Sequence, residues 1–198
     1  DDLSLRDTLG RLTERDAILC RQTAPLVSGA YAMIARGRAC RILGKEIGEG
    51  LVNLVEQQKA KGIERLIEKL GAWRDREMAR FIAKNDERRA EAVADRVNCL
   101  LVIVDALPET GRTIPALVAR IRGMFSDDKD ANLLTLATVH KVKGLEYPTV
   151  AILRPELMPS KAARQDWMVE QETNLMYVAA TRAKETLIYV RDEDMEIG

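Results

Sequence analysis

The sequence predicts an α/β fold that is interrupted by a helical insertion. Short apolar runs typical of buried strands lie near both ends of the chain, at 17–20, 39–43, 133–136, 150–153 and 187–190. Polar turns and segments with helical spacing separate these runs, which is the alternation expected of α/β folds. From about residue 50 to residue 130 the apolar residues recur at helical spacing only.

Composition places the chain among folded globular proteins. Its 198 residues are 46% hydrophobic and 31% charged, which suffices for one domain with a real core and excludes a disordered chain. Lys plus Arg equals Asp plus Glu at 31 each, so the chain has no overall attraction for nucleic acid. Any nucleic-acid binding must therefore be local.

The cysteines and the apolar runs indicate in which cellular compartment the protein is expected. Cys20, Cys40 and Cys99 are widely spaced and lack metal-ligand spacing, so we expect reduced thiols in a cytoplasmic protein. No apolar run approaches the roughly 20 residues that span a bilayer, so we expect no membrane partner. The chain starts at Asp1 rather than Met, in an acidic stretch unlike a secretory signal, and we expect an excised domain or fragment.

The first part of the chain predicts a strand–helix–strand unit after a short helical lead-in over 1–16. The run 17–20 is a strand, and Arg21 follows at its carboxyl end. Residues 26–36 have helical spacing, and Gly37 is the predicted C-terminal cap. The run 39–43 is the next strand.

The insertion predicts a set of amphipathic helices. Helical spacing continues from residue 50 to residue 107, and a further helix covers 114–125. Thr113 is its predicted cap and Pro115 falls in its first turn. Residues 126–130 form a polar loop before the strand pattern resumes.

Two polar turns carry the candidate chemistry. Thr138 and His140 follow one strand run, and Gly144 and Glu146 come shortly afterwards. A helical segment over 174–180 leads into Arg182, just before the last strand run. Because ligands of open α/β sheets bind at the carboxyl ends of strands, we expect these turns at that edge.

Two stretches resemble a known family: TVHKVKGLEY at 138–147 and ETNLMYVAATRA at 172–183. They are similar, in order and separation, to motifs V and VI of superfamily 1 DNA helicases of the UvrD, Rep and PcrA type. The resemblance implies the second RecA-like motor domain, a parallel sheet of the P-loop NTPase type. It extends to the start of the chain, where the family has Tyr-Arg-x-Asn after a strand and only Arg21 matches.

The resemblance implies a domain organisation in three parts. Residues 1–49 are the first part of RecA-like domain 2, and residues 131–198 are its second part with motifs V and VI. Residues 50–130 are the insertion, a reduced form of the family's 2B-like helical subdomain.

The resemblance assigns ATP contacts to three residues. Arg182 is the arginine finger, because a planar guanidinium neutralises charge on a transferring phosphoryl group. The alternative is an arginine that satisfies carbonyls at a helix end. Glu146 accepts hydrogen bonds from ribose hydroxyls, or is an ordinary solvated carboxylate. Gly144 supplies the tight turn that aims Glu146.

The resemblance also assigns DNA contacts. Thr138 and His140 match positions that touch the DNA backbone, and a hydroxyl and an imidazole N–H are suitable donors to phosphate. His140 is the chain's one histidine, and its alternative is a capping or buried structural role. Arg21 lies in a region that the family places near single-stranded DNA. The family usually has two acidic residues at 171 and 172; here Gln171 precedes Glu172, which we expect to orient its neighbours.

The chain lacks a G-x-x-x-x-G-K-[ST] phosphate loop. The resemblance therefore implies half of an ATP site, with ATP and Mg²⁺ bound mainly by an N-terminal RecA-like domain. In the complete helicase we expect ATP hydrolysis to drive translocation on single-stranded DNA, and we expect the isolated chain to be inactive. Two alternatives remain: a non-catalytic helicase-like module that binds DNA or protein, and a structural scaffold whose insertion is a docking surface.

Overall fold

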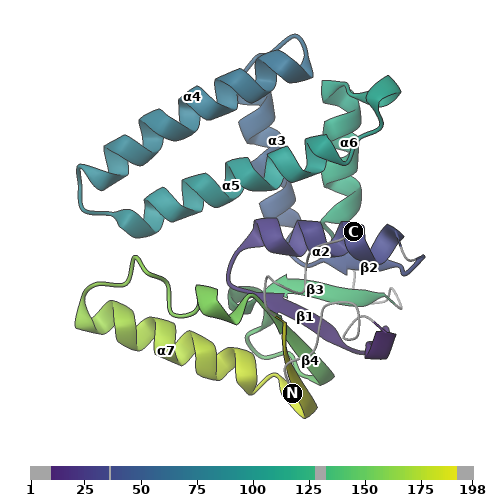
Figure 1. Cartoon of the computed structure of the whole chain (residues 1–198), viewed down its shortest axis with the longest axis vertical. Coiled ribbons are helices and arrows are strands. Elements are labelled where there is room, and N and C mark those ends of the chain that lie inside the picture. Colours follow the sequence, from purple (N-terminus) through teal and green to yellow (C-terminus); the bar gives the residue numbers. More distant parts are fainter. Residues whose placement is uncertain (1–9, 36, 128–132, 191–198) are drawn as a thin grey trace. The chain divides into compact units, whose positions relative to one another are not determined.

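The computed structural model describes residues 10–35, 37–127 and 133–190, and the chain divides into two compact units. One unit, the sheet unit, comprises Asp1–Leu43 and Asp128–Gly198; the other, the helical unit, comprises Gly44–Asp127. Figure 1 labels the elements of both. The helical unit begins at Gly44 because helix α3 (Lys45–Gln57) packs inside it, whereas the sequence pattern starts the insertion at residue 50.

The sheet unit contains a parallel sheet, in which the described residues form five strands. The order is β2-β3-β1-β4-β5, and every neighbouring pair is parallel. The strands are β1 (Ala17–Cys20), β2 (Cys40–Ile42), β3 (Leu134–Thr138), β4 (Tyr147–Leu153) and β5 (Ala183–Val190). This architecture confirms the predicted α/β fold, and each predicted strand run lies on an observed strand.

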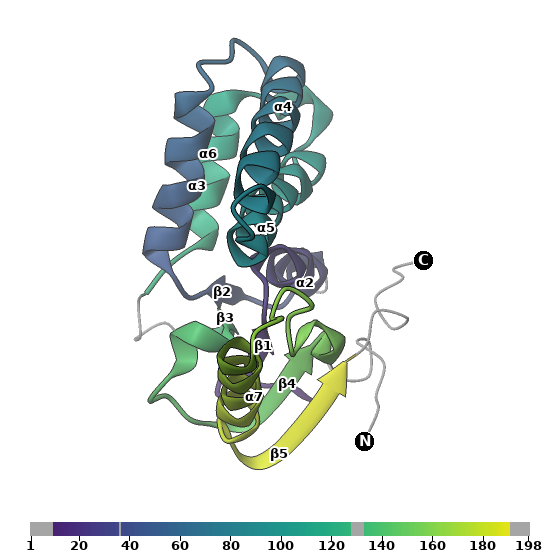
Figure 2. The same ribbon diagram turned by 90° about the vertical axis from the view of Figure 1, so that its left-hand side faces the viewer.

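Helices cover both faces of the sheet. Gly29 of α2 (Thr23–Ala35) lies against Leu136 and Leu153 on one face. On the other face α7 (Asp166–Ala180) contributes Ala179 to the core, and Figure 2 shows the two helices on opposite sides of the strands. Because both faces are covered, strands such as β1 are buried throughout and read as continuous apolar runs.

The end of α2 follows the predicted glycine cap. Gly37 has φ 71°, and its N–H donates to the Ile34 carbonyl at 2.9 Å while the N–H of Arg38 donates to the Met33 carbonyl at 3.0 Å. These two bonds form a Schellman motif and confirm Gly37 as the cap. The helix starts at Thr23, earlier than the predicted residue 26, with Pro25 in a first turn where its missing N–H costs nothing.

The helical unit, all of whose residues are described, holds four α-helices and a short 3-10 turn, η1 (Glu109–Gly111). Alongside α3 these helices are α4 (Ile63–Ile82), α5 (Glu87–Asp105) and α6 (Ile114–Met124). α4 packs against α5, and α6 packs against both α3 and α5. Their buried residues are mainly branched aliphatics, including Leu51, Leu66, Leu100, Ile103 and Ile121.

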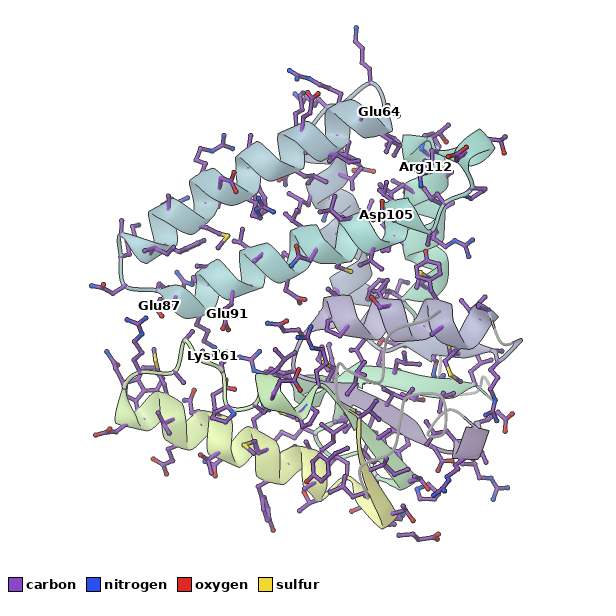
Figure 3. The ribbon with its side chains drawn as sticks, viewed as in Figure 1. Glu64, Glu87, Glu91, Asp105, Arg112 and Lys161 are labelled. Carbon is purple, nitrogen blue, oxygen red and sulfur yellow. The ribbon has the colours of Figure 1, made fainter. Side chains whose placement is uncertain are left out.

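Side chains bind backbone groups at the start of α6 and at the end of α5. The Thr113 hydroxyl accepts a hydrogen bond from the Ala116 N–H, which confirms the predicted cap of α6. At the end of α5, Arg112 donates to the carbonyls of Leu107 and Asp105 at 3.3 and 3.2 Å (Figure 3). These bonds satisfy carbonyl groups that a helix end leaves without intrahelical partners.

The two ends of the helical unit are joined to each other. The Asp127 carboxylate accepts hydrogen bonds from the N–H groups of Gly44 at 2.8 Å and Lys45 at 3.2 Å. Gly44 precedes α3 with φ 124°, a conformation that favours glycine. Asp127 therefore satisfies two of the N–H groups that the start of α3 leaves without intrahelical partners.

The described helices include none that is long and apolar enough to cross a membrane. Cys20, Cys40 and Cys99 are free thiols. Burial raises the pKa of the Cys40 thiol to about 11, so this thiol stays protonated at neutral pH.

Replacing Gly48 by alanine is expected to destabilise the helical unit. An added Cβ at Gly48 would lie 2.8 Å from the Phe125 Cβ, so α3 and the end of α6 would have to move apart. Overpacking of this kind costs about 1–3 kcal/mol. Gly50→Ala, in the same helix and with no atom near its added Cβ, is the control. Urea unfolding should give Gly48→Ala a lower free energy of unfolding than Gly50→Ala. Equal values would show that α3 and Phe125 can move apart without loss of stability.

Candidate functional site

The register of the sheet separates the predicted site residues into two groups. Thr138 lies opposite Cys20 at the carboxyl ends of β3 and β1, so Arg21 and His140 follow at this edge. Tyr147 lies opposite Ala183 where β4 and β5 begin. Glu146 and Arg182 directly precede these strands and therefore lie at the amino edge.

The expectation that all polar turns gather at the carboxyl edge is therefore wrong for Gly144, Glu146 and Arg182. A parallel connection has to return to the amino edge before the next strand starts, so its last residues lie there. The seven residues of β4 span about 20 Å at ~3.3 Å per residue, which is the separation of the two edges.

A buried ion pair dominates the carboxyl edge. The Arg21 guanidinium donates to both oxygens of Glu172, from Nε at 3.0 Å and from Nη2 at 2.9 Å. The side chains are only 13% and 7% exposed. Glu172 also accepts the backbone N–H of Ser160 at 3.1 Å. One carboxylate thus connects the end of β1, helix α7 and the segment that leads from β4 to α7.

The surroundings of Glu172 favour its ionised form. Burial acts to raise its pKa, but the hydrogen bonds from Arg21 and Ser160 and the charges of Arg21 and His140 outweigh burial. The net effect holds the pKa of Glu172 below its usual value. The predicted orienting role of this carboxylate is consistent with these contacts.

The two other residues at this edge are accessible. His140 is exposed on η2 (Val139–Val142), the 3-10 turn that directly follows β3, and Thr138 is half-buried at the end of that strand. Val139 and Val142 are fully buried and anchor the turn in the core, which packs against α7. The hydroxyl and imidazole therefore sit on a fixed backbone, while Arg21 beside them is engaged with Glu172.

Arg182 connects motif VI to motif V at the amino edge. Its Nε donates to the Val178 carbonyl at 3.0 Å, Nη1 to the Leu145 carbonyl at 3.0 Å, and Nη2 to the Thr181 hydroxyl at 3.1 Å. The guanidinium in this conformation satisfies helix-end and turn carbonyls, which is the alternative role considered from the sequence. The residue is half-buried.

Glu146 and Gly144 form the accessible side of the same edge. Gly144 has φ 85°, and a Cβ added there would meet no atom within 4 Å, so the turn requires glycine for its conformation rather than for packing. Glu146 pairs with Lys184 at 3.3 Å, and both side chains are more than half exposed. The amino edge thus holds a guanidinium, an ammonium and a carboxylate, which are groups that can bind the phosphates and hydroxyls of a nucleotide. No described residues cluster as a metal-binding group of His, Cys, Asp or Glu.

Helix α7 joins the two edges. Its 15 residues run from Asp166 to Ala180, about 22 Å at 1.5 Å per residue, with Glu172 in its first half and Arg182 just after its end. The sequence pattern predicted only 174–180. Lys184 and Ser160 were not singled out, although Lys184 falls two residues after the motif arginine.

Glu172→Gln is expected to weaken the fold and to flatten its response to acid. A carboxyl whose pKa is lower in the folded state adds stability above its unfolded value of about 4.3, and this stability is lost as pH falls through the folded pKa. Removing one partner of a buried pair costs about 3 kcal/mol. Urea unfolding measured from pH 7 to pH 3 should give Glu172→Gln a lower free energy of unfolding than the parent chain at pH 7. Its free energy of unfolding should also fall less steeply as the pH is lowered.

Glu170→Gln, an exposed neighbour on α7, serves as the matched control and should stay within about 0.5 kcal/mol of the parent chain. If Glu172→Gln and Glu170→Gln behave alike, the ion pair does not stabilise the fold.

Comparison with known proteins identifies the family. The UvrD-like helicase C-terminal domain matches residues 45–192. YjcD of Bacillus subtilis (strain 168), whose name assigns it to the ATP-dependent DNA helicases, is 31% identical over 114 residues, which cover 52% of this chain and 14% of YjcD. The ATP-dependent DNA helicase PcrA of Staphylococcus epidermidis is 43% identical over 70 residues, which cover 32% of this chain and 10% of PcrA. The matches thus span a small part of each relative. The chain belongs to the UvrD-like helicase C-terminal domain family and is homologous to ATP-dependent DNA helicases.

Proposed function

We propose that this chain is the second motor domain of a DNA helicase, coupling ATP hydrolysis to translocation on single-stranded DNA. The observation that carries the proposal is the placement of the motif residues by α7. Glu172, near the middle of this helix, is bound to Arg21 at the edge that holds Thr138 and His140, and the end of the helix leads into Arg182. A single rigid element thus links the candidate DNA contacts to the candidate ATP contacts.

The amino edge is the proposed ATP side. ATP with Mg²⁺, held mainly by an N-terminal RecA-like domain, supplies the phosphoryl group. Arg182 acts as the arginine finger after exchanging its bonds to neutral carbonyls for bonds to phosphate oxygens, which are stronger because the acceptor is charged. Glu146, exposed beside it, accepts ribose hydroxyls, and Gly144 gives the turn its shape.

The carboxyl edge is the proposed DNA side. Thr138 and His140 donate to phosphate oxygens of one strand and fix its register without reading its sequence. Arg21 supports them by holding Glu172. A direct contact between Arg21 and DNA stays a prediction, because the guanidinium would have to be shared with this buried carboxylate.

The partner of this domain is proposed to be the N-terminal RecA-like domain, in the same polypeptide or in a separate chain. Tyr177 of α7 is 71% exposed and Met176 beside it is 41% exposed, so the helix has apolar side chains available for packing. Closure of the two domains on ATP and opening after hydrolysis would move the edge that holds DNA.

A non-catalytic helicase-like module is the second candidate, and one observation favours it. Nε, Nη1 and Nη2 of Arg182 all donate to protein acceptors, which is the geometry of a structural arginine. The two functions differ in whether Arg182 contributes to hydrolysis.

Arg182→Ala is expected to lower DNA-stimulated ATP hydrolysis by about 10³-fold or more, the contribution typical of an arginine finger. The measurement is steady-state ATPase activity with single-stranded DNA, in the chain combined with its N-terminal motor domain; the chain alone should be inactive. Arg182→Lys keeps the charge but loses the bidentate fork, so its activity should remain well below the parent value. Unchanged hydrolysis in correctly folded Arg182→Ala would support the binding module instead.

His140→Ala is expected to weaken binding of single-stranded DNA by about fivefold, the value of one hydrogen bond of about 1 kcal/mol. Thr138→Ala should have a similar effect, while Thr138→Ser, which keeps the hydroxyl, should bind normally. Fluorescence anisotropy with a labelled oligonucleotide measures the affinity at fixed salt. Full affinity in both alanine variants would remove these residues from the proposed DNA contact.

A further inference from the structure

We infer that Lys184 is a positioning residue that holds the Glu146 carboxylate for recognition of the nucleotide ribose. The inference rests on the proposed function, in which Glu146 accepts ribose hydroxyls. Lys184 lies outside the two motif stretches, 138–147 and 172–183, and enters the site because β5 runs beside β4. Its role is to act on Glu146 rather than to touch the ribose itself.

The backbone on both sides of Glu146 is fixed by one residue. The carbonyl of Leu145 accepts Nη1 of Arg182 at 3.0 Å, and the N–H of Tyr147 donates to the Arg182 carbonyl at 2.9 Å. With its neighbours held in this way, the part of Glu146 that can still move is its side chain. The side chain therefore decides whether the carboxylate faces a bound nucleotide.

Lys184 supplies the contact that restrains this side chain. Its ammonium lies 3.3 Å from Oε2 of Glu146, and the register that places Ala183 opposite Tyr147 makes Lys184 the next residue along β5. The described residues show no bond to Oε1, which leaves this oxygen to accept a hydroxyl. Because the two side chains are 58% and 55% exposed, the pair is accessible to a ligand.

The expected size of the effect follows from this exposure. Exposed ion pairs contribute little free energy in water. Loss of this pair should therefore change nucleotide binding by only about two- to fivefold. The effect should require the ribose hydroxyls, because Lys184 acts through Glu146. A lysine that simply attracts the triphosphate would instead affect nucleotides with and without these hydroxyls alike.

The test compares ATP with 2′,3′-dideoxy-ATP, which lacks both hydroxyls, as substrates for DNA-stimulated hydrolysis by the chain combined with its N-terminal motor domain. The readout is the ratio of kcat/KM for the two nucleotides. Lys184→Met should lower the preference for ATP about two- to fivefold, Lys184→Arg should retain it, and Lys184→Glu should lower it further by repelling Glu146. Lys161→Met, at another exposed lysine of the sheet unit, should leave the preference unchanged.

Glu146→Ala separates the inference from the function on which it rests. If Lys184→Met alone lowers the preference for ATP, Glu146→Ala removes it, and Lys184→Met has no additional effect in the Glu146→Ala background, the positioning role stands. If Glu146→Ala removes the preference while Lys184→Met alone leaves it intact, or changes both nucleotides equally, the inference is wrong and the ribose contact stands. If Glu146→Ala leaves the preference intact, the ribose contact itself fails, and the role of Lys184 fails with it.

Discussion

The buried pair between Arg21 and Glu172 is the interaction on which the sheet unit depends most. Two charges leave water to form it, and this cost is offset only because the guanidinium binds both carboxylate oxygens and Ser160 adds a third donor. The pair brings together parts of the chain 151 residues apart. Since Glu172 lies near the middle of α7, the pair also holds this helix against the carboxyl edge of the sheet, and the helix continues from there toward Arg182.

The amino and carboxyl edges of the sheet have different chemical characters. At the carboxyl edge the Arg21 cation is neutralised inside the protein, while the hydroxyl of Thr138, the imidazole of His140 and the exposed Lys141 remain accessible. At the amino edge Arg182 and Lys184 are half-buried or exposed and bind a carbonyl and a carboxylate that a ligand could replace. The two edges therefore differ in charge although the whole chain has equal numbers of acidic and basic residues.

The strands and caps could be predicted from the sequence because their causes are local. A strand covered on both faces reads as an apolar run, and Gly37 and Thr113 act on neighbouring residues. The first two turns of α7 could not, because Trp167 and Val169 are 50% and 42% exposed and break the helical pattern of burial. The prediction that Glu146 lies at the carboxyl edge was wrong because the chain crosses from that edge to the amino edge between His140 and Glu146. The partner of Arg21 was beyond prediction, since no local pattern reports a contact between residues so far apart.

The bond between Asp127 and Gly44 has a consequence for how this kind of domain can vary. The first and last residues of the helical unit are hydrogen-bonded to each other, so the two ends of this unit lie together. The hydrogen bond depends on Gly44 and Asp127 alone and on none of the helices that lie between them. The closure at the base of the helical unit therefore sets no fixed length for the segment between its two ends.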